Sequence, residues 1–164
     1  MSGGNALLLS RYVIEAKPYH SELEESSWEE STVRTWLNTD FYNLAFAEAE
    51  FEVVEKELKN DVGAATEDKV FLLSKEEAEY YFSSDESKIA KATDCAIAHG
   101  VYEFNNFEGD YENLNRNCRW WLRSSNLSDG GALWVNALGE IDVFGYRANT
   151  VMVGVRPAMW VKIK

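Results

Sequence analysis

Arg119-Trp120-Trp121-Leu122-Arg123-Ser124 is the stretch of sequence that decides the fold, together with Gly154-Val155-Arg156-Pro157-Ala158 near the end of the chain. Two adjacent tryptophans on a strand point to opposite faces, so one enters the core and the other needs a second cover. Between the two stretches lie short apolar runs that end near glycines: Ala132 to Ala137, Glu140 to Phe144 and Thr150 to Val155. Such runs predict strands of one antiparallel sheet, built mostly from the last third of the chain.

The first part of the chain predicts one strand followed by helices. Ala6 to Glu15 has the apolar and aromatic residues of a strand. Ser31 is an expected helix N-cap, with one helix over Thr32 to Asn38 and a second over about Thr39 to Ala49. Trp28 is expected to anchor the acidic loop before these helices.

The middle of the chain predicts a buried strand and a third helix. Lys69 to Leu73 is almost continuously apolar, which is typical of a strand buried on both faces. Ser74 and Glu77 have the spacing of a capping box and begin the helix. The order of elements predicts an α+β domain.

Composition limits the classes of function. The chain has 164 residues, of which 46% are hydrophobic, and this favours a single domain over residues 1–164, with residues 1–5 expected to lie outside its ordered part. A formal net charge of -12 argues against nucleic acid, because neutralising phosphates requires clustered Lys and Arg. Since no apolar run approaches the length of a membrane span, we expect no membrane insertion.

Cysteine and histidine are scarce, with Cys95, Cys118, His20 and His99 as the complete set. We expect buried free thiols, with a disulfide or a reactive or metal-binding site as the alternatives. Two histidines and no CxxC spacing are too few for an obvious zinc site. We therefore expect no metal and no cofactor.

Three arginines lie inside apolar motifs, which is unusual for a charged residue: Arg34, Arg123 and Arg156. A buried guanidinium without a partner is costly, so each should contact a carboxylate or several backbone carbonyls. We interpret them as structural pairs that fix loops to the sheet, and an anion-binding site is the alternative.

Motifs in order along nearly the whole chain resemble a bacterial domain family of unknown function, common in low-GC Gram-positive bacteria and their phages. The motifs are Leu7-Leu8-Leu9-Ser10, Trp28, Ser31-Thr32-Val33-Arg34-Thr35-Trp36-Leu37-Asn38, Phe41-Tyr42, Ala45-Phe46, Glu50, Asp68-Lys69-Val70-Phe71-Leu72-Leu73-Ser74, Trp120-Trp121-Leu122-Arg123-Ser124 and Gly154-Val155-Arg156-Pro157-Ala158. The family is similar to the C-type-lectin-like fold, which formylglycine-generating enzymes and the variable proteins of diversity-generating retroelements share. The resemblance implies a twisted antiparallel sheet, two to three packed helices, long loops, and pairing of the first and last strands.

The resemblance leaves three classes of function. An oxidase of the formylglycine-generating type uses a close pair of reactive cysteines near the C-terminal end, and Cys95 and Cys118 do not have that arrangement. Calcium-dependent sugar binding uses Glu-Pro-Asn, Gln-Pro-Asp or Trp-Asn-Asp signatures, and these are absent from the sequence. We therefore expect no enzymatic activity but a ligand-binding module, and keep the oxidase and a structural module of a larger surface protein as alternatives.

The expected ligand-binding surface is the C-terminal sheet and its loops, because aromatic, Arg and Asn side chains on rigid strands are typical of recognition surfaces. Its candidate residues are Ser125, Asn126, Leu127, Ser128, Asp129, Trp134, Asn136, Phe144, Tyr146 and Arg147. For Trp134 and Phe144, burial in the core and exposure are equally compatible with the sequence. Tyr146 and Arg147 follow Gly145 and are expected to be exposed. The ligand is an unknown protein or carbohydrate, and the resemblance points to a cell surface or a phage particle.

Overall fold

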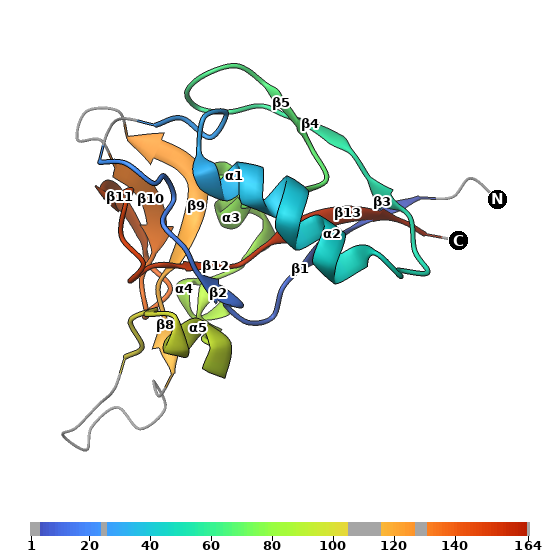
Figure 1. Cartoon of the computed structure of the whole chain (residues 1–164). Helices are drawn as coiled ribbons and strands as arrows, with labels where there is room; N and C mark the ends of the chain where they lie inside the picture. Colours follow the sequence, from blue (N-terminus) through green and yellow to red (C-terminus); the bar gives the residue numbers. More distant parts are fainter. Residues whose placement is uncertain (1–3, 24–25, 105–115, 127–130, 164) are drawn as a thin grey trace.

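The computed structural model describes residues 4–23, 26–104, 116–126 and 131–163. These residues form a mixed α+β structure of open sheets with a few short helices (Figure 1). The helices are α1 (Thr32–Trp36), a π-helical turn (Leu37–Phe41), α2 (Tyr42–Phe46), α3 (Lys75–Tyr81), α4 (Asp85–Lys88) and α5 (Asp94–Ala98). The strands are β1 (Asn5–Leu9), β2 (Glu15–Ala16), β3 (Val53–Val54), β4 (Lys56–Leu58), β5 (Thr66–Asp68), β6 (Val70–Phe71), β7 (Ala90–Lys91), β8 (Asn117–Cys118), β9 (Trp120–Asn126), β10 (Gly131–Val135), β11 (Ile141–Arg147), β12 (Gly154–Val155) and β13 (Ala158–Lys162). Within the described ranges, no helix has both the length and the apolar composition that crossing a membrane requires.

The apolar runs expected to form one sheet do share a sheet, as β10, β11 and β12, but the expectation that all of them are antiparallel is wrong for β12, and β13 belongs to another sheet. One sheet has the order β11-β10-β9-β12-β2, and β12 runs parallel to β9 within it. In the other sheet β13 pairs with β1, β3 and β6. Arg156 and Pro157 separate β12 from β13. Because proline has no backbone N–H to continue a ladder, the chain leaves the first sheet there and enters the second.

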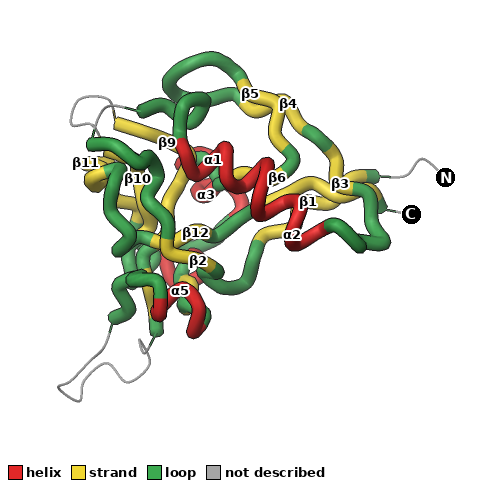
Figure 2. The backbone as a smooth tube through the Cα atoms, in the orientation of Figure 1, coloured by secondary structure: helices red, strands yellow, loops and turns green. Residues whose placement is uncertain are grey.

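The two ends of the described chain lie together in the β1–β13 pair. Asn5 is opposite Lys162 and Leu9 is opposite Ala158, and Figures 1 and 2 show both termini on the same side. Pairing of the first and last strands is therefore confirmed. The expectation that residues 1–5 lie outside the ordered part is wrong at Asn5, which already belongs to β1, and residues 1–3 lie outside the described ranges.

The expected strand over Ala6 to Glu15 is interrupted between β1 and β2. Arg156 occupies this break, because its Nε donates to the carbonyl of Ser10 at 2.9 Å. The chain bends around the guanidinium, and β2 then pairs with β12 rather than continuing beside β13.

The two expected helices after Ser31 form one continuous helix, with the π-helical turn between α1 and α2. The Ser31 cap is confirmed, since its hydroxyl accepts from the Arg34 N–H at 3.3 Å. Asn38 ties the π-helical turn to the strand region: its side chain donates to Val70 O at 2.8 Å and accepts from Lys69 N at 2.9 Å. No Gly or Pro ends the helix here, so the chain absorbs this tether as a π-bulge.

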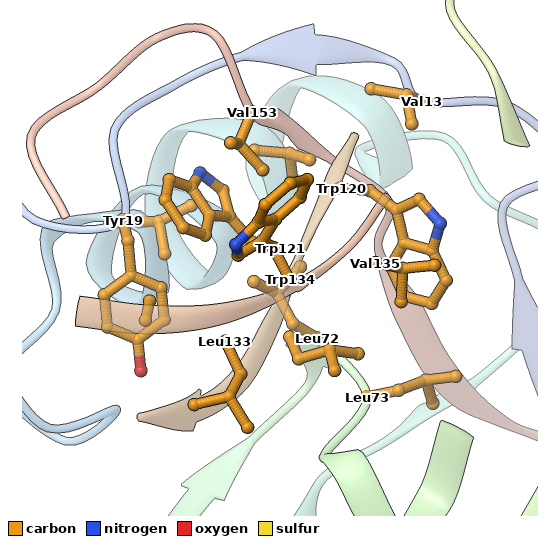
Figure 3. Close-up of a cluster of buried hydrophobic side chains, with 14 of the residues drawn as sticks. Val13, Tyr19, Leu72, Leu73, Trp120, Trp121, Leu133, Trp134, Val135 and Val153 are labelled. Atoms are coloured by element: carbon orange, nitrogen blue, oxygen red, sulfur yellow. The ribbon is translucent and has the colours of Figure 1, made fainter. Parts of the chain in front are cut away.

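Both adjacent tryptophans of β9 are completely buried, at 0% exposure (Figure 3). Trp121 packs against Tyr19 with ring centroids 5.9 Å apart, and Trp120 packs against Phe82 at 6.4 Å. Trp120 Nε1 donates to Lys88 O at 3.1 Å and Trp121 Nε1 to Lys17 O at 3.0 Å. The second cover that the sequence demanded is therefore present, as α3, α4 and the chain around them.

The capping box at Ser74 and Glu77 is confirmed, and it also fixes a buried arginine. Arg123 donates to Glu77 Oε1 at 3.0 Å and to Leu72 O at 2.9 Å. Helix α3 is thereby attached to the middle of β9.

Buried polar groups attach the first helix and the acidic loop to the sheets. Asp68, which is buried, accepts from Arg34 Nε at 2.7 Å and from Trp28 Nε1 at 2.9 Å. Trp28 is 1% exposed, so its predicted role as the anchor of the loop is confirmed.

Arg156 contacts backbone carbonyls and aromatic rings. It donates to Ser10 O and to Lys88 O at 2.9 and 3.0 Å, and its guanidinium lies 5.0 Å from the centroid of Trp120. Burial lowers the pKa of Arg156 to about 10, so the side chain stays charged at neutral pH. All three arginines thus have the structural partners that the sequence predicted.

Replacing either Trp120 or Trp121 by alanine should lower the free energy of unfolding by about 3–5 kcal/mol, because each ring leaves a large cavity. Tyr80→Ala is the matched control, since Tyr80 is 82% exposed and should change stability by no more than about 0.5 kcal/mol. Urea denaturation measures all three. A Trp variant as stable as the control would contradict the two-sided burial of β9.

Gly139→Ala should lower the free energy of unfolding by about 2–4 kcal/mol, because Gly139 has φ +88° and an added Cβ would lie 1.8 Å from Asp85 O. Gly4→Ala is the control, with no atom within 4 Å of the added Cβ. Equal stability of the two variants in urea denaturation would rule out this close approach between the β10–β11 turn and α4.

Candidate functional site

Strand β11 forms one edge of the five-stranded sheet and bulges at its centre. Tyr146 is opposite Ala132 and Asp142 is opposite Trp134, so the segment 143–145 spans the place of Leu133 alone. Gly145 adopts φ +80°, which favours glycine at this position. A bulge re-aims side chains, and Phe144 is 77% exposed on this edge.

Beside this bulge lies an arginine–aromatic cluster of Tyr102, Arg119, Trp134 and Tyr146. The guanidinium carbon of Arg119 lies 4.7 Å from the Trp134 ring centroid, 5.0 Å from that of Tyr102 and 5.8 Å from that of Tyr146. Trp134 and Tyr146 pack edge to face with centroids 5.7 Å apart. The rings hold the cation in place without neutralising its charge.

The cluster contains hydrogen-bond donors without acceptors. The side chain of Arg119 makes no hydrogen bond or ion pair to any other residue that the structure describes, whereas the side chains of Arg34, Arg123 and Arg156 all do. The buried indole N–H of Trp134 likewise has no acceptor among these residues. A positioned guanidinium with free N–H groups is suited to binding a carboxylate or another anionic group.

Two of the five residues predicted around this loop, Ser125 and Asn126, lie within the described residues, and both belong to β9. Ser125 and Asn126 are half-buried in β9, where Asn126 Nδ2 donates to Val143 O at 3.3 Å and supports the bulge. Leu127, Ser128 and Asp129 lie outside the described residues.

Asn136 builds the turn between β10 and β11. Its Oδ1 accepts from Leu138 N at 2.8 Å and from Glu140 N at 3.0 Å, and its Nδ2 donates to Glu140 Oε2 at 2.8 Å. Asn136 therefore shapes the β10–β11 connection that carries β11.

The structure shows which of the predicted residues near the bulge are buried and which are exposed. Trp134 is 7% exposed and belongs to the core, Phe144 is exposed, and Arg147 is exposed as expected. Tyr146 was expected to be exposed but is half-buried, because its ring packs on Trp134 and Arg119.

The sequence reasoning missed Arg119 and Tyr102. The sequence did contain a signal for Arg119. Arg119 precedes Trp121 by two residues, and residues two apart on a strand lie on the same face, so the spacing predicts Arg119 on the same face as Trp121. Tyr102 had no such signal, since its position next to Arg119 depends on a contact between distant segments.

The two cysteines differ in environment, and both are free. Cys118 is buried, its thiol donates to Ala90 O at 3.5 Å, and burial raises the pKa of that thiol to about 12. Cys95 is exposed, so the expectation of two buried thiols is wrong for it. Its Sγ lies 3.8 Å from His99 Nδ1, one helical turn away, and Glu15 adjoins the same ring nitrogen.

Tyr146→Ala should destabilise the chain by about 1–2 kcal/mol, since it removes an aromatic pair, while Arg147→Ala should remain within about 0.5 kcal/mol of the unchanged protein. Urea denaturation of the two variants checks the assignment. Comparable losses for both residues would show that Arg147 is also part of the packed structure.

Residues 3–163 match a protein-family model described as Domain of unknown function (DUF6273). Comparisons with curated proteins and with solved structures gave no match.

Proposed function

Because this chain belongs to the DUF6273 family, whose description names no activity, we propose its function from the site itself: a non-enzymatic module that binds a protein ligand. The ligand contacts β11 and the arginine–aromatic cluster with an acidic side chain. The observation that carries the proposal is Arg119, a cation fixed between aromatic rings whose donors have no partner among the described residues.

The bulge in β11 favours recognition by side chains over addition of a strand. Bulged edges pair poorly with another chain, because the ladder is interrupted and the strand twists away. The same bulge presents Phe144 to solvent beside Tyr146. Trp, Tyr and Arg side chains, the residue types of the cluster, are enriched among the residues that contribute most to protein–protein binding.

Charge supports an acidic ligand. The chain carries a formal net charge of -12, and yet the exposed Arg147 lies on β11 and the guanidinium of Arg119, just before β9, lies 5.8 Å from the ring centroid of Tyr146 on β11. Two arginine side chains can attract an anionic group at short range, although the net charge of the chain is negative. A neutral carbohydrate would stack on the aromatic rings and accept hydrogen bonds from the arginines, but it would not neutralise their charge.

We further propose that the α+β structure is a C-type-lectin-like fold, and that its variable positions would lie at this edge if the protein is diversified by a retroelement. The antiparallel β1–β13 pair supports the first statement, since that fold joins its first and last strands. Sequencing the genomic neighbourhood tests the second. A reverse transcriptase gene beside a near-repeat of the 3′ coding end is expected, and a locus without both would contradict diversification.

Selection from a random peptide library, alongside a glycan array, tests the binding function. We expect acidic peptides with an aromatic residue to be enriched, and their affinity to fall about tenfold or more in Arg119→Gln and in Phe144→Ala. The matched controls are Arg11→Gln and Tyr80→Ala, which change an exposed arginine and an exposed aromatic elsewhere.

Ligands that bind Arg119→Gln and Phe144→Ala as tightly as the unchanged chain would place the binding surface elsewhere. Glycans bound in preference to peptides would replace the protein ligand by a carbohydrate. No binding in either format would favour the structural module of a larger surface protein.

A further inference from the structure

A second cluster of chemically active side chains lies at the opposite edge of the five-stranded sheet, on β2 and α5. Glu15 belongs to β2, while Cys95 and His99 belong to α5 and its C-terminal end. The Cys95 sulfur, His99 Nδ1 and a Glu15 carboxylate oxygen all lie within 4.8 Å of one another. We propose that these three groups bind a zinc ion or a similar thiophilic divalent metal.

The chemistry of the three ligands selects the metal. Thiolate, imidazole and carboxylate are the ligand types of Zn²⁺, whereas Ca²⁺ and Mg²⁺ take oxygen ligands alone. Three protein ligands leave a fourth tetrahedral position. That position faces solvent, because Cys95 is exposed and the side chain of His99 is 56% exposed.

The geometry favours a shared metal over a catalytic relay. In a Cys–His–Glu relay the thiol and the carboxylate contact different ring nitrogens. Here Cys95 Sγ lies 3.8 Å from His99 Nδ1, and Glu15 Oε1 lies 2.5 Å from that same nitrogen. Convergence on a single nitrogen suits three ligands that surround one ion.

Only a small adjustment separates this arrangement from a coordinated one. Tetrahedral zinc with ordinary bond lengths places its N, O and S ligand atoms about 3.3–3.6 Å apart. The sulfur-to-nitrogen separation of 3.8 Å is already close to that value, and the Glu15 carboxylate must withdraw by about 1 Å from His99. The sulfur and the Glu15 oxygen lie within 4.8 Å of each other and must also reach a separation of about 3.6 Å. Glu15 Oε1 also accepts from Ala16 N at 2.8 Å, which holds the carboxylate at the site.

The backbone that carries the ligands is fixed on both sides. Glu15 lies opposite Val155 in the β2–β12 pair. Helix α5 is attached just before it begins, since Thr93 N donates to Val13 O at 3.0 Å and Thr93 Oγ1 donates to Ile14 O at 3.3 Å. The three side chains therefore need little ordering to bind a metal.

Calorimetric titration with ZnCl₂ tests the proposal, on folded chain that carries no added histidine tag and is kept reduced. We expect one Zn²⁺ to bind per chain. Its affinity should fall about 10–100-fold or more in Cys95→Ser, His99→Ala and Glu15→Gln, because loss of a ligand should cost at least as much affinity as loss of a residue that only supports a ligand. Asp94→Asn is the matched control for Glu15→Gln, because it also removes one negative charge. Asp94 is adjacent to Cys95 in the sequence, and the side chain of Asp94 is 95% exposed. Ca²⁺ should not compete.

Titration with Co²⁺ gives a readout that needs no variant. Thiolate coordination should produce a sulfur-to-cobalt charge-transfer band, and the exposed Cys95 is the thiol available for it, since Cys118 is buried. Three results would each overturn the site. The first is unchanged Zn²⁺ affinity in Cys95→Ser, and the second is an equal loss of affinity in Asp94→Asn and Glu15→Gln. The third is a folded chain that binds no Zn²⁺ and shows no cobalt band. None of these results bears on peptide binding at β11, which is the other edge of the sheet.

Discussion

Burial of strand β9 on both faces is the constraint on which the rest of the structure depends. A strand with Trp120 and Trp121 side by side cannot face water on either side without exposing a large apolar ring. Tyr19 and the acidic loop cover one face, and Phe82 with α3 and α4 covers the other. Helix α3 contacts β9 directly, whereas the π-helical turn contacts β6 and α5 contacts β2.

Buried charges hold these covers in place, and they do so through partners far apart in the sequence. Arg123 joins β9 to α3 through Glu77, and Asp68 joins Trp28 and Arg34 to the strand region. Leaving one member of such a pair buried alone costs about 3–5 kcal/mol, so the pairs specify the arrangement even where their net stabilisation is small. Arg119 departs from this rule, because its guanidinium lies among aromatic rings and has no acceptor among the described residues, and this is the feature on which the proposed ligand binding rests.

The five-stranded sheet ends in two edges of different chemistry. The β11 edge is bulged and carries aromatic and positively charged groups, whereas the β2 edge is covered by α5 and carries a thiol, an imidazole and a carboxylate. Both sets are on or next to strands fixed by the buried β9. A rigid centre with chemically distinct edges allows the edge residues to vary without loss of the fold.

The sequence by itself determined the local features: the caps at Ser31 and Ser74, the burial of the tryptophan pair, and the need of the three arginines for partners. These follow from short-range spacing and from the cost of burying an unpaired charge. Only the tertiary structure decided that the C-terminal strands divide between two sheets. It also decided that Tyr102 meets Arg119 and that Glu15 meets Cys95 and His99. Each of these depends on pairing between segments distant in sequence, and no local pattern records which distant segment will supply the partner.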